Sequence, residues 1–329
     1  MLNNNEIQEG IKEFGLNNDS KFRKIPNGIN SNVYIINDNS DNYILKFYRV
    51  DNNIPTRLER EVCALKLFQE NGINNVPVLL NYSKELNCSL LSYISGENIS
   101  TFSEDYIVHF QSFYKKILSL SKTVNKESLS LNAIDCCLEI DTVNKQIISR
   151  LTKLKEENNP EINELLNQMD DFFKIVENQV NALHNDFNDL KPILSTVDFG
   201  INNALFVNNM LHFIDFEFFG WDNPIHLISD TISHPANGLN ILQQSALLDA
   251  LFECYRVKEE KEQIKEAFNG VNLLFDIKWC LIMLNPFLGS YNSNFAQSEI
   301  HSRQAVQKNK VIDKVALIKL KMQNAIFFH

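Results

Sequence analysis

The sequence lacks the features that mark secreted and membrane-spanning proteins. Its first ten residues, MLNNNEIQEG, contain no basic segment followed by an apolar stretch, so we expect no secretory signal. No stretch approaches the roughly 18 uninterrupted apolar residues that a membrane helix needs. We therefore expect a cytoplasmic protein without a membrane partner.

Metal-binding cysteine pairs and an excess of positive charge are also absent. None of the six cysteines forms a C-x-x-C pair, so we expect free thiols instead of structural zinc or a disulfide framework. Lys and Arg number 31 against 41 Asp and Glu, a net charge of −10 that disfavours nucleic acid as a partner. The cysteines are Cys63, Cys88, Cys136, Cys137, Cys254 and Cys280.

What is present is a globular composition, 44% hydrophobic and 22% charged, in which the hydrophobic period changes along the chain. The first part alternates as in β-strands around one helix, which predicts a small sheet. The expected elements are an amphipathic helix within 1–20, strands at 33–36 and 43–48, a helix at 57–70, and strands at 76–80 and 89–94.

Beyond residue 96 the pattern becomes mainly helical. Helices are expected at 104–122, within 139–183 with a break near Asn159-Pro160, and through most of 240–326, with strand-like runs at 203–207 and 211–216. These elements predict an α+β protein of two lobes. A β-rich N-terminal lobe, 1–95, would join a larger, mainly helical lobe, 96–329, through a hinge near 92–96.

The strongest chemical signal is the segment ILSTVDFGINNALFVNNMLHFIDFEFFGWDNP. Two apolar runs around an Asn-Asn turn predict a β-hairpin with Asn203 and Asp215 at its two ends and Asp198 on the loop that enters it. Phosphoryl transfer needs this set: one carboxylate to orient a hydroxyl group, and an amide and a second carboxylate to hold Mg²⁺. A solvated, metal-free Asx-rich loop is the alternative.

Two further features fit a nucleotide site. Lys46 lies inside the apolar strand YILKFY, so it is either solvated at a sheet edge or paired with a buried acid, for which Glu61 is the candidate. Before the first strand, GINSNVY offers a turn whose N–H groups could surround phosphates, although most such turns bind nothing.

In this order the motifs resemble the aminoglycoside phosphotransferase and choline kinase family, over about residues 20 to 290. The resemblance implies a protein-kinase-like fold and a kinase that uses ATP or GTP with Mg²⁺. It implies a phosphate loop at Gly28, Ser31, Asn32 and Tyr34, the Lys46–Glu61 pair, and an adenine-binding hinge in LLSYISGE that contains Tyr93. It also implies Asp198 as catalytic residue, Asn203 and Asp215 as metal ligands, and a downstream Gly220-Trp221-Asp222-Asn223-Pro224 stretch with Asp230.

The catalytic loop departs from the family pattern. The family usually has His-x-Asp, but Thr196 stands two residues before Asp198. LSTVDFG instead resembles a bacterial subset with Ser-x-x-Asp-Phe-Gly, as does the later WCLIMLNPF. The text His184-Asn185-Asp186 is not expected to be the catalytic loop, because Lys191 stands where an asparagine should follow. It is expected at a helix end or in a loop.

We therefore expect a small-molecule kinase that phosphorylates a hydroxyl group of a sugar, an aminoglycoside-like compound or an amino alcohol. The alternative is a pseudokinase-like protein that binds nucleotide without transfer, favoured by the missing histidine. A protein kinase is disfavoured because Asp198-Phe199-Gly200 occupies the catalytic-loop position and the metal segment reads Asp215-Phe216-Glu217. Glu217 is expected either to support the site or to be a simple strand-end charge.

Overall fold

The chain forms two compact units. The computed structural model describes residues 3–26, 30–51, 53–180, 184–292 and 296–324. Unit 1 consists of Met1–Ile134 and Leu194–Trp221, and unit 2 of Asp135–Ile193 and Asp222–His329. The first unit carries an antiparallel sheet and the second is helical, which confirms the α+β class. This division differs from the lobe boundary expected at residue 95, which stays a prediction.

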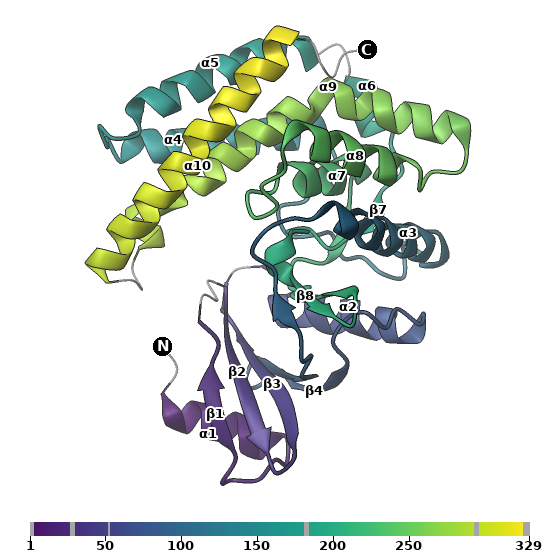
Figure 1. Cartoon of the computed structure of the whole chain (residues 1–329), viewed down its shortest axis with the longest axis vertical. Coiled ribbons are helices and arrows are strands. Elements are labelled where there is room, and N and C mark those ends of the chain that lie inside the picture. Colours follow the sequence, from purple (N-terminus) through teal and green to yellow (C-terminus); the bar gives the residue numbers. More distant parts are fainter. Residues whose placement is uncertain (1–2, 27–29, 52, 181–183, 293–295, 325–329) are drawn as a thin grey trace. The chain divides into compact units, whose positions relative to one another are not determined.

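The main sheet of unit 1 has five antiparallel strands in the order β1-β2-β3-β5-β4 (Figure 1). Strand β1 was not expected from the sequence, because its KFRK run has no apolar alternation. The strands are β1 (Lys21–Lys24), β2 (Ser31–Asp38), β3 (Asp41–Tyr48), β4 (Leu79–Ser83) and β5 (Cys88–Ser92). β4 thus begins three residues after the start expected from the sequence.

Helix α1 (Asn4–Glu13) covers part of this sheet. It begins with a capping box between Asn3 and Glu6, and its buried Ile7 and Ile11 pack with apolar residues of β2 and β3. Gly10 allows the close approach, since a Cβ atom there would lie 2.9 Å from the ring of Phe47. The amphipathic pattern of the first twenty residues therefore predicted this helix and its buried face.

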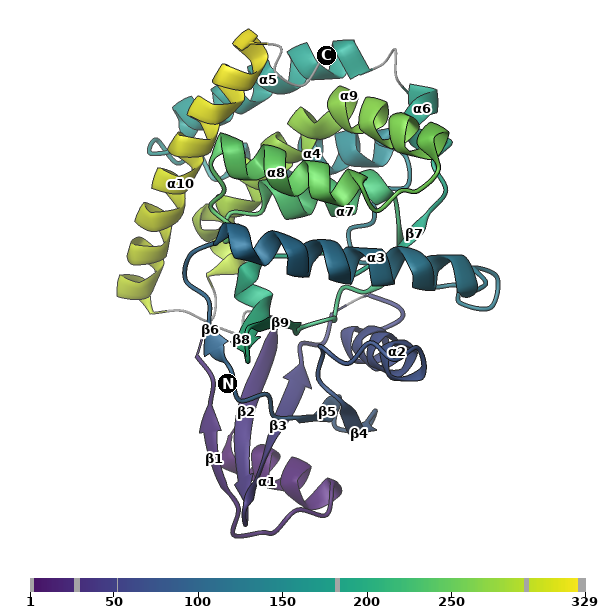
Figure 2. The same ribbon diagram turned by 45° about the vertical axis from the view of Figure 1, so that its right-hand side comes forward.

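The rest of unit 1 surrounds a second, three-stranded sheet of order β6-β8-β9 (Figure 2). Its aromatic core joins α3 to the hairpin: the ring of Phe113 lies 4.5 Å from that of Phe213, and Phe199 lies 4.9 Å from Phe213. The elements are α2 (Arg57–Glu70), β6 (Glu97–Asn98), η1 (Glu104–Tyr106), α3 (Ile107–Thr123), η3 (Ile201–Asn203), β8 (Ala204–Val207) and β9 (Met210–Phe213).

Unit 2 is built around α9 (Lys258–Met283), which contacts α4, α5, α7 and α10. Lys258–Phe287 is long and apolar enough to cross a membrane, but 89% of its most apolar window is buried inside the protein, as in a core helix. The other elements are α4 (Ile140–Glu156), α5 (Asn163–Val180), α6 (His184–Asn188), α7 (Pro224–Ser233), α8 (Ile241–Phe252), η4 (Asn285–Phe287), η5 (Gly289–Tyr291) and α10 (Gln297–Asn324). The chain passes between the units three times: between Ile134 and Asp135, within the short strand β7 (Ile193–Ser195) and within the short strand β10 (Gly220–Asp222).

A buried polar network fixes α7 against α9 in unit 2. His226 Nδ1 lies 2.5 Å from Asp222 Oδ2, and its Nε2 lies 3.0 Å from Lys278 Nζ. Lys278 in turn lies 3.6 Å from Cys137 Sγ. Trp279 Nε1 donates to Asp230 Oδ1 at 3.0 Å. His226 is therefore part of the buried core, and WCLIMLNPF is mostly a core segment.

A second buried ion network joins α9 to α10. Asp276 is 1% exposed, and its two carboxylate oxygens lie 2.8 Å from Lys314 Nζ and 2.8 Å from Lys321 Nζ. Burial alone would raise the pKa of Asp276, but the two ammonium groups outweigh it and hold the pKa well below its usual range. The ionised carboxylate is thus part of the native packing of α10.

Asp276→Asn should destabilise the protein by about 3–5 kcal/mol at pH 7, because it removes the buried carboxylate that pairs with the ammonium groups of Lys314 and Lys321. The carboxylate contributes this stability above its unfolded pKa of about 3.9, and loses it as the pH falls toward the lower folded value. Thermal unfolding of both proteins from pH 7 to pH 2 should therefore show a constant gap that closes below about pH 4. Asp170→Asn, which removes a more exposed pair with Lys155 on α4, should cost at most about 1 kcal/mol. An equal cost for both variants would contradict the assignment.

Candidate active site

Lys46 is a buried lysine at the centre of an acidic cluster in unit 1. It lies on β3 between Leu45 and Phe47, and its side chain is 4% exposed. Its Nζ atom lies 2.6 Å from Glu61 Oε2 and 2.6 Å from Asp215 Oδ1. Of the two readings of YILKFY, the structure shows the paired, buried lysine.

Glu61 comes from the buried face of α2. This helix begins with a capping box between Thr56 and Glu59, which fixes its first turn and places Glu61 one turn later, where it is 1% exposed. Glu61 Oε1 also accepts a hydrogen bond of 3.3 Å from the backbone nitrogen of Phe216. One carboxylate therefore holds both Lys46 and the segment that carries Asp215.

Glu217 is a member of the cluster that the sequence left undecided. It is 1% exposed, and its Oε2 lies 3.3 Å from Lys46 Nζ, although without the geometry of a hydrogen bond. Its Oε1 accepts a 3.0 Å hydrogen bond from Arg57 Nη1, and the Arg57 guanidinium lies over the ring of Phe218. The signal that could have found it was a lone acid in an aromatic run, FEFF, which needs a buried cation.

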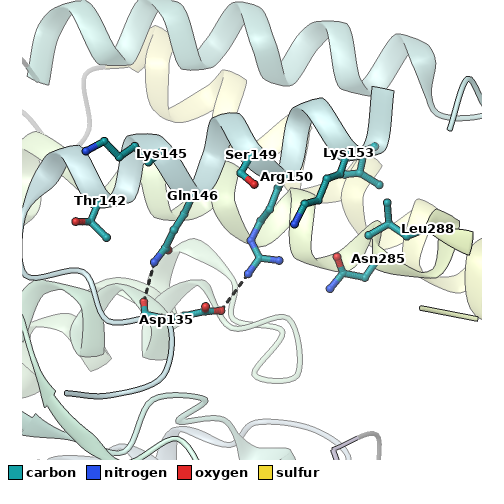
Figure 3. Close-up of a pocket in the computed structure, with 10 residues that line it drawn as sticks. Asp135, Thr142, Lys145, Gln146, Ser149, Arg150, Lys153, Asn285 and Leu288 are labelled. Carbon is teal, nitrogen blue, oxygen red and sulfur yellow. Dashed lines mark hydrogen bonds and ion pairs between the residues drawn. The ribbon is translucent and has the colours of Figure 1, made fainter. Parts of the chain in front are cut away.

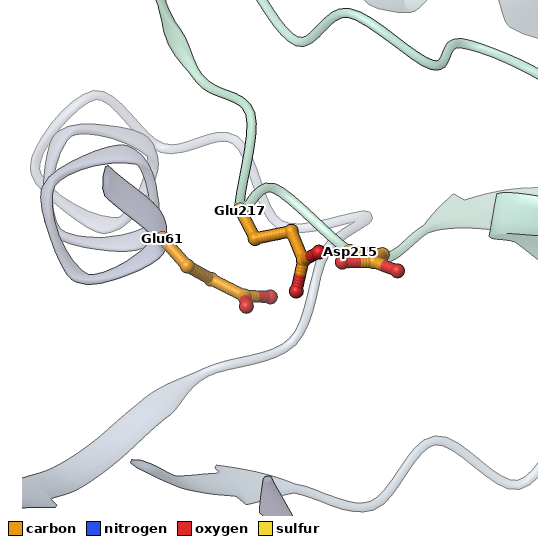
Figure 4. Close-up of side chains that lie close together, drawn as sticks. All are labelled: Glu61, Asp215 and Glu217. Atoms are coloured by element: carbon orange, nitrogen blue, oxygen red, sulfur yellow. The ribbon is translucent and has the colours of Figure 1, made fainter. Parts of the chain in front are cut away.

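The three carboxylates face one another closely enough to hold a cation (Figure 4). Oxygens of Glu61, Asp215 and Glu217 lie within 4.8 Å of one another, and the Lys46 ammonium is within 3.3 Å of all three residues. Burial alone would lower the pKa of Lys46, but the three carboxylates hold it well above its usual range. Burial is the largest cause that raises the pKa of Glu217 to about 7, and the charge of Asp215 adds to it.

The predicted hairpin is present in β8 and β9. Ala204 pairs with Phe213, and the turn residues Asn208 and Asn209 have φ of 47° and 62°, the left-handed backbone that a tight hairpin turn requires. Strand β9 ends at Phe213 instead of continuing to 216. Asn203 O accepts a 2.9 Å hydrogen bond from Ile214 N, so Asn203 and Asp215 lie at the open end of the hairpin.

Asp198 is tied to this open end by Asn203. The Asn203 Nδ2 atom donates 2.9 Å hydrogen bonds to both the backbone oxygen and the Oδ2 atom of Asp198. Val197 and Asp198 have φ of 46° and 45°, and a β-branched residue rarely adopts such values. Backbone strain of this kind gathers at functional sites. The structure therefore brings Asp198, Asn203 and Asp215 to one end of one hairpin.

Thr196 occupies the position where the family pattern has histidine. It is 3% exposed, and its Oγ1 atom has no hydrogen-bond partner among the described residues. A buried threonine cannot supply the imidazole N–H groups of a histidine. The orientation of Asp198 rests instead on the hydrogen bonds from Asn203.

Three other residues expected at a nucleotide site lie on or next to strands of the main sheet. Ser31 and Asn32 are the first residues of β2, where they pair with Tyr48 and Phe47, rather than part of a turn before the strand. Gly28 lies outside the described residues. Tyr93 follows β5 and is half-buried. The contacts that these residues would make with nucleotide stay predictions.

Comparison with known proteins identifies the family of this site. A model of the phosphotransferase enzyme family matches residues 21–256. The chain belongs to the phosphotransferase enzyme family. This confirms the resemblance drawn from the motifs, and the protein is a phosphotransferase. No match is found among curated proteins.

Solved structures show that this phosphotransferase has a protein-kinase-like fold. A spectinomycin phosphotransferase, APH(9)-Ia, in complex with ADP and spectinomycin has a TM-score of 0.62 and 13% identity, over 95% of this chain and 98% of that one. A gentamicin complex of APH(2")-IIa has a TM-score of 0.61 and 17% identity, over 96% of each chain. A choline kinase from Cryptosporidium parvum Iowa II has a TM-score of 0.61 and 11% identity, over 99% of this chain and 100% of that one.

The rejected His184-Asn185-Asp186 text lies in α6 of unit 2, whereas the hairpin site belongs to unit 1. The expectation that it belongs to a helix end or loop rather than to the catalytic loop is consistent with this position.

Gly220 of the Gly-Trp stretch is required by the packing of unit 1. A Cβ atom at this position would collide with the backbone of Asn132 and Ala133, so only glycine allows the two segments to approach this closely.

Proposed function

We propose that this phosphotransferase is a Mg²⁺-dependent kinase that moves the γ-phosphate of ATP or GTP to a hydroxyl group of a small molecule. The observation that carries the proposal is the buried Lys46, which is bonded to Glu61 and Asp215. Asp215 lies at the open end of the hairpin, where the Asn203 amide also bonds Asp198. Phosphoryl transfer depends mainly on positioning and charge, and these are the groups that kinases use for it. The related spectinomycin phosphotransferase structure contains ADP.

The residues at the hairpin fit a magnesium ion. Asp215 is 35% exposed and offers a carboxylate, and the Asn203 Oδ1 atom is bonded only by the exposed Asn202 amide among the described contacts. Two hard oxygen ligands with room for water are typical of Mg²⁺ sites. When bound, the ion would neutralise charge on the phosphate groups.

The chain's own groups then have distinct roles. Lys46 steadies the α- and β-phosphates, and Glu61 with Glu217 fixes the position of its ammonium. Asp198 accepts a hydrogen bond from the acceptor hydroxyl and orients it for in-line attack. Asn203 holds Asp198 while it offers its amide oxygen to the metal. The acceptor is a sugar, an aminoglycoside-like compound or an amino alcohol, and the reaction takes place in the cytoplasm.

One observation favours a second candidate, a nucleotide-binding protein without transfer activity. Thr196 replaces the family histidine and has no hydrogen-bond partner for its buried Oγ1 among the described residues. The kinase assignment remains our proposal because two pairs of groups that it needs are formed, Lys46 with Glu61 and Asn203 with Asp198.

The experiment that separates the two is a screen of small hydroxyl compounds with ADP release as the readout. We expect at least one acceptor to stimulate ADP release in the presence of Mg²⁺. Removal of Mg²⁺ with EDTA should abolish the signal, and added Mg²⁺ should restore it. Mg²⁺-dependent nucleotide binding with no transfer to any acceptor would favour the second candidate, and activity that persists in EDTA would exclude the proposed metal role.

A further inference from the structure

Unit 2 contains a cavity of about 370 Å³ along one face of α4. Pockets for small molecules usually begin at about 300 Å³, so it can hold a small metabolite. None of its lining residues belongs to unit 1, which carries the phosphotransferase site. The lining residues are Asp135, Thr142, Lys145, Gln146, Ser149, Arg150, Lys153, Leu154, Asn285 and Leu288.

The charges on this cavity are unbalanced. Lys145, Arg150 and Lys153 line it with one acid, Asp135, whose Oδ2 atom lies 3.0 Å from Arg150 Nη2 (Figure 3). Among the described residues, no carboxylate forms an ion pair with Lys145 or Lys153. Two lysines therefore line the cavity without a carboxylate partner among the described residues, in a chain whose net charge is −10. Arg150 and Lys153 are three residues apart on α4, a spacing at which like charges repel, and a bound anion would offset that repulsion.

The floor of the cavity is held in place by hydrogen bonds. Gln146 Nε2 donates to the backbone oxygen of Asp135 at 3.1 Å, and its Oε1 accepts from Cys137 Sγ at 3.4 Å. Cys137 is fully buried and adjoins the Lys278–His226 network. Arg150 and Gln146 both reach from α4 to Asp135 (Figure 3), so the Arg150 guanidinium is positioned before any ligand arrives.

Neutral donors complete the set. The hydroxyl groups of Thr142 and Ser149 and the amide of Asn285 also line the cavity. A phosphate group offers more acceptor oxygens than two ammonium groups can satisfy, and hydroxyl and amide donors can bond the remainder. The cavity exceeds the size of phosphate alone, which leaves room for a short polar chain.

We propose that this cavity binds a small phosphorylated metabolite, with its phosphate between Lys145, Arg150 and Lys153. The site goes beyond the proposed kinase reaction and does not depend on it. Arg150 supplies a planar donor set suited to phosphate, and the two lysines supply the uncompensated charge.

Isothermal titration calorimetry with glycerol 3-phosphate tests the proposal, with glycerol as the uncharged comparison. We expect the wild-type protein to bind glycerol 3-phosphate and not glycerol. The double variant Lys145→Gln/Lys153→Gln should bind at least tenfold more weakly, since it loses two charge-assisted hydrogen bonds. Both lysines are exposed, so the fold should survive, and circular dichroism checks this.

Two single variants sharpen the test. Asp135→Asn should bind several-fold more tightly, because it removes the one carboxylate among the described residues that line the cavity; asparagine also tolerates the φ of 56° at this position. Lys174→Gln on α5, an exposed lysine that does not line the cavity, should bind as the wild type does. Unchanged affinity in the double variant, equal binding of glycerol, or no binding at all would overturn the proposal.

Discussion

Asp198→Asn is expected to lower the rate of phosphate transfer by about 10²–10⁴-fold, the range over which a positioned acid–base group contributes. The amide keeps an oxygen that can accept from Asn203 Nδ2, which in the native protein bonds Asp198 Oδ2 at 2.9 Å. Asparagine also tolerates the φ of 45° at this position. The variant therefore removes the negative charge and leaves the loop in place.

The measurement is ADP release with the acceptor found by the screen, together with nucleotide affinity by calorimetry. Affinity should stay within a few-fold of wild type, because Asp198 is assigned to the acceptor hydroxyl and not to the phosphates. Asp198→Ala should be equally inactive. Met210→Ala, at an exposed position beside the turn of the same hairpin and away from its open end, should retain activity. Full transfer activity in both Asp198 variants would exclude this residue as the catalytic aspartate.

Lys46→Met should destabilise the protein by about 3–5 kcal/mol and remove nucleotide binding. Methionine approximates the length of lysine but removes the ammonium group shared by Glu61, Asp215 and Glu217, two of which are 1% exposed, and leaves Arg57 as the cation beside Glu217. Breaking a buried charge pair has this cost because the remaining charge is neither solvated nor paired. Chemical denaturation monitored by circular dichroism gives the change in unfolding free energy.

Two further variants keep this prediction testable if Lys46→Met folds poorly. Adding Glu217→Gln to Lys46→Met should recover part of the lost stability, since one buried carboxylate is neutralised. Lys84→Met removes an ion pair of similar length, 2.8 Å to Glu59, but Lys84 is 67% exposed, and stability should not change measurably. If Glu217→Gln worsens the defect, the repulsion between carboxylates is not its cause.

Local patterns predicted much of the hairpin and of the sheet. The Asn-Asn turn between two apolar runs predicted β8 and β9 because only a few residues accept the left-handed backbone of such a turn. The alternation of YILKFY predicted a strand, but it could not decide whether Lys46 is solvated or buried. That depended on α2, whose Glu61 lies fifteen residues away.

The role of Glu217 could not be predicted in the same way. Its partners are Lys46 and Arg57, which are about 170 and 160 residues distant in sequence, and no local period relates them. The turn expected at Ser31 and Asn32 was wrong for another reason. Its residues are typical of turns, yet pairing with Phe47 and Tyr48 on β3 extends β2 to Ser31, because ladder hydrogen bonds outweigh a weak turn preference.

By itself the sequence determined most of the helices, the central strands of the main sheet, the hairpin, and the residues Lys46, Glu61, Asp198, Asn203 and Asp215 as candidates for a phosphotransferase site. These depend on hydrophobic period and turn chemistry, which act over a few residues. Only the tertiary structure decided that Lys46 lies among three carboxylates and that Asn203 holds Asp198. It also placed three cations around a cavity on α4. Contacts of that kind depend on where distant segments pack, and burial then sets the strength of their charges.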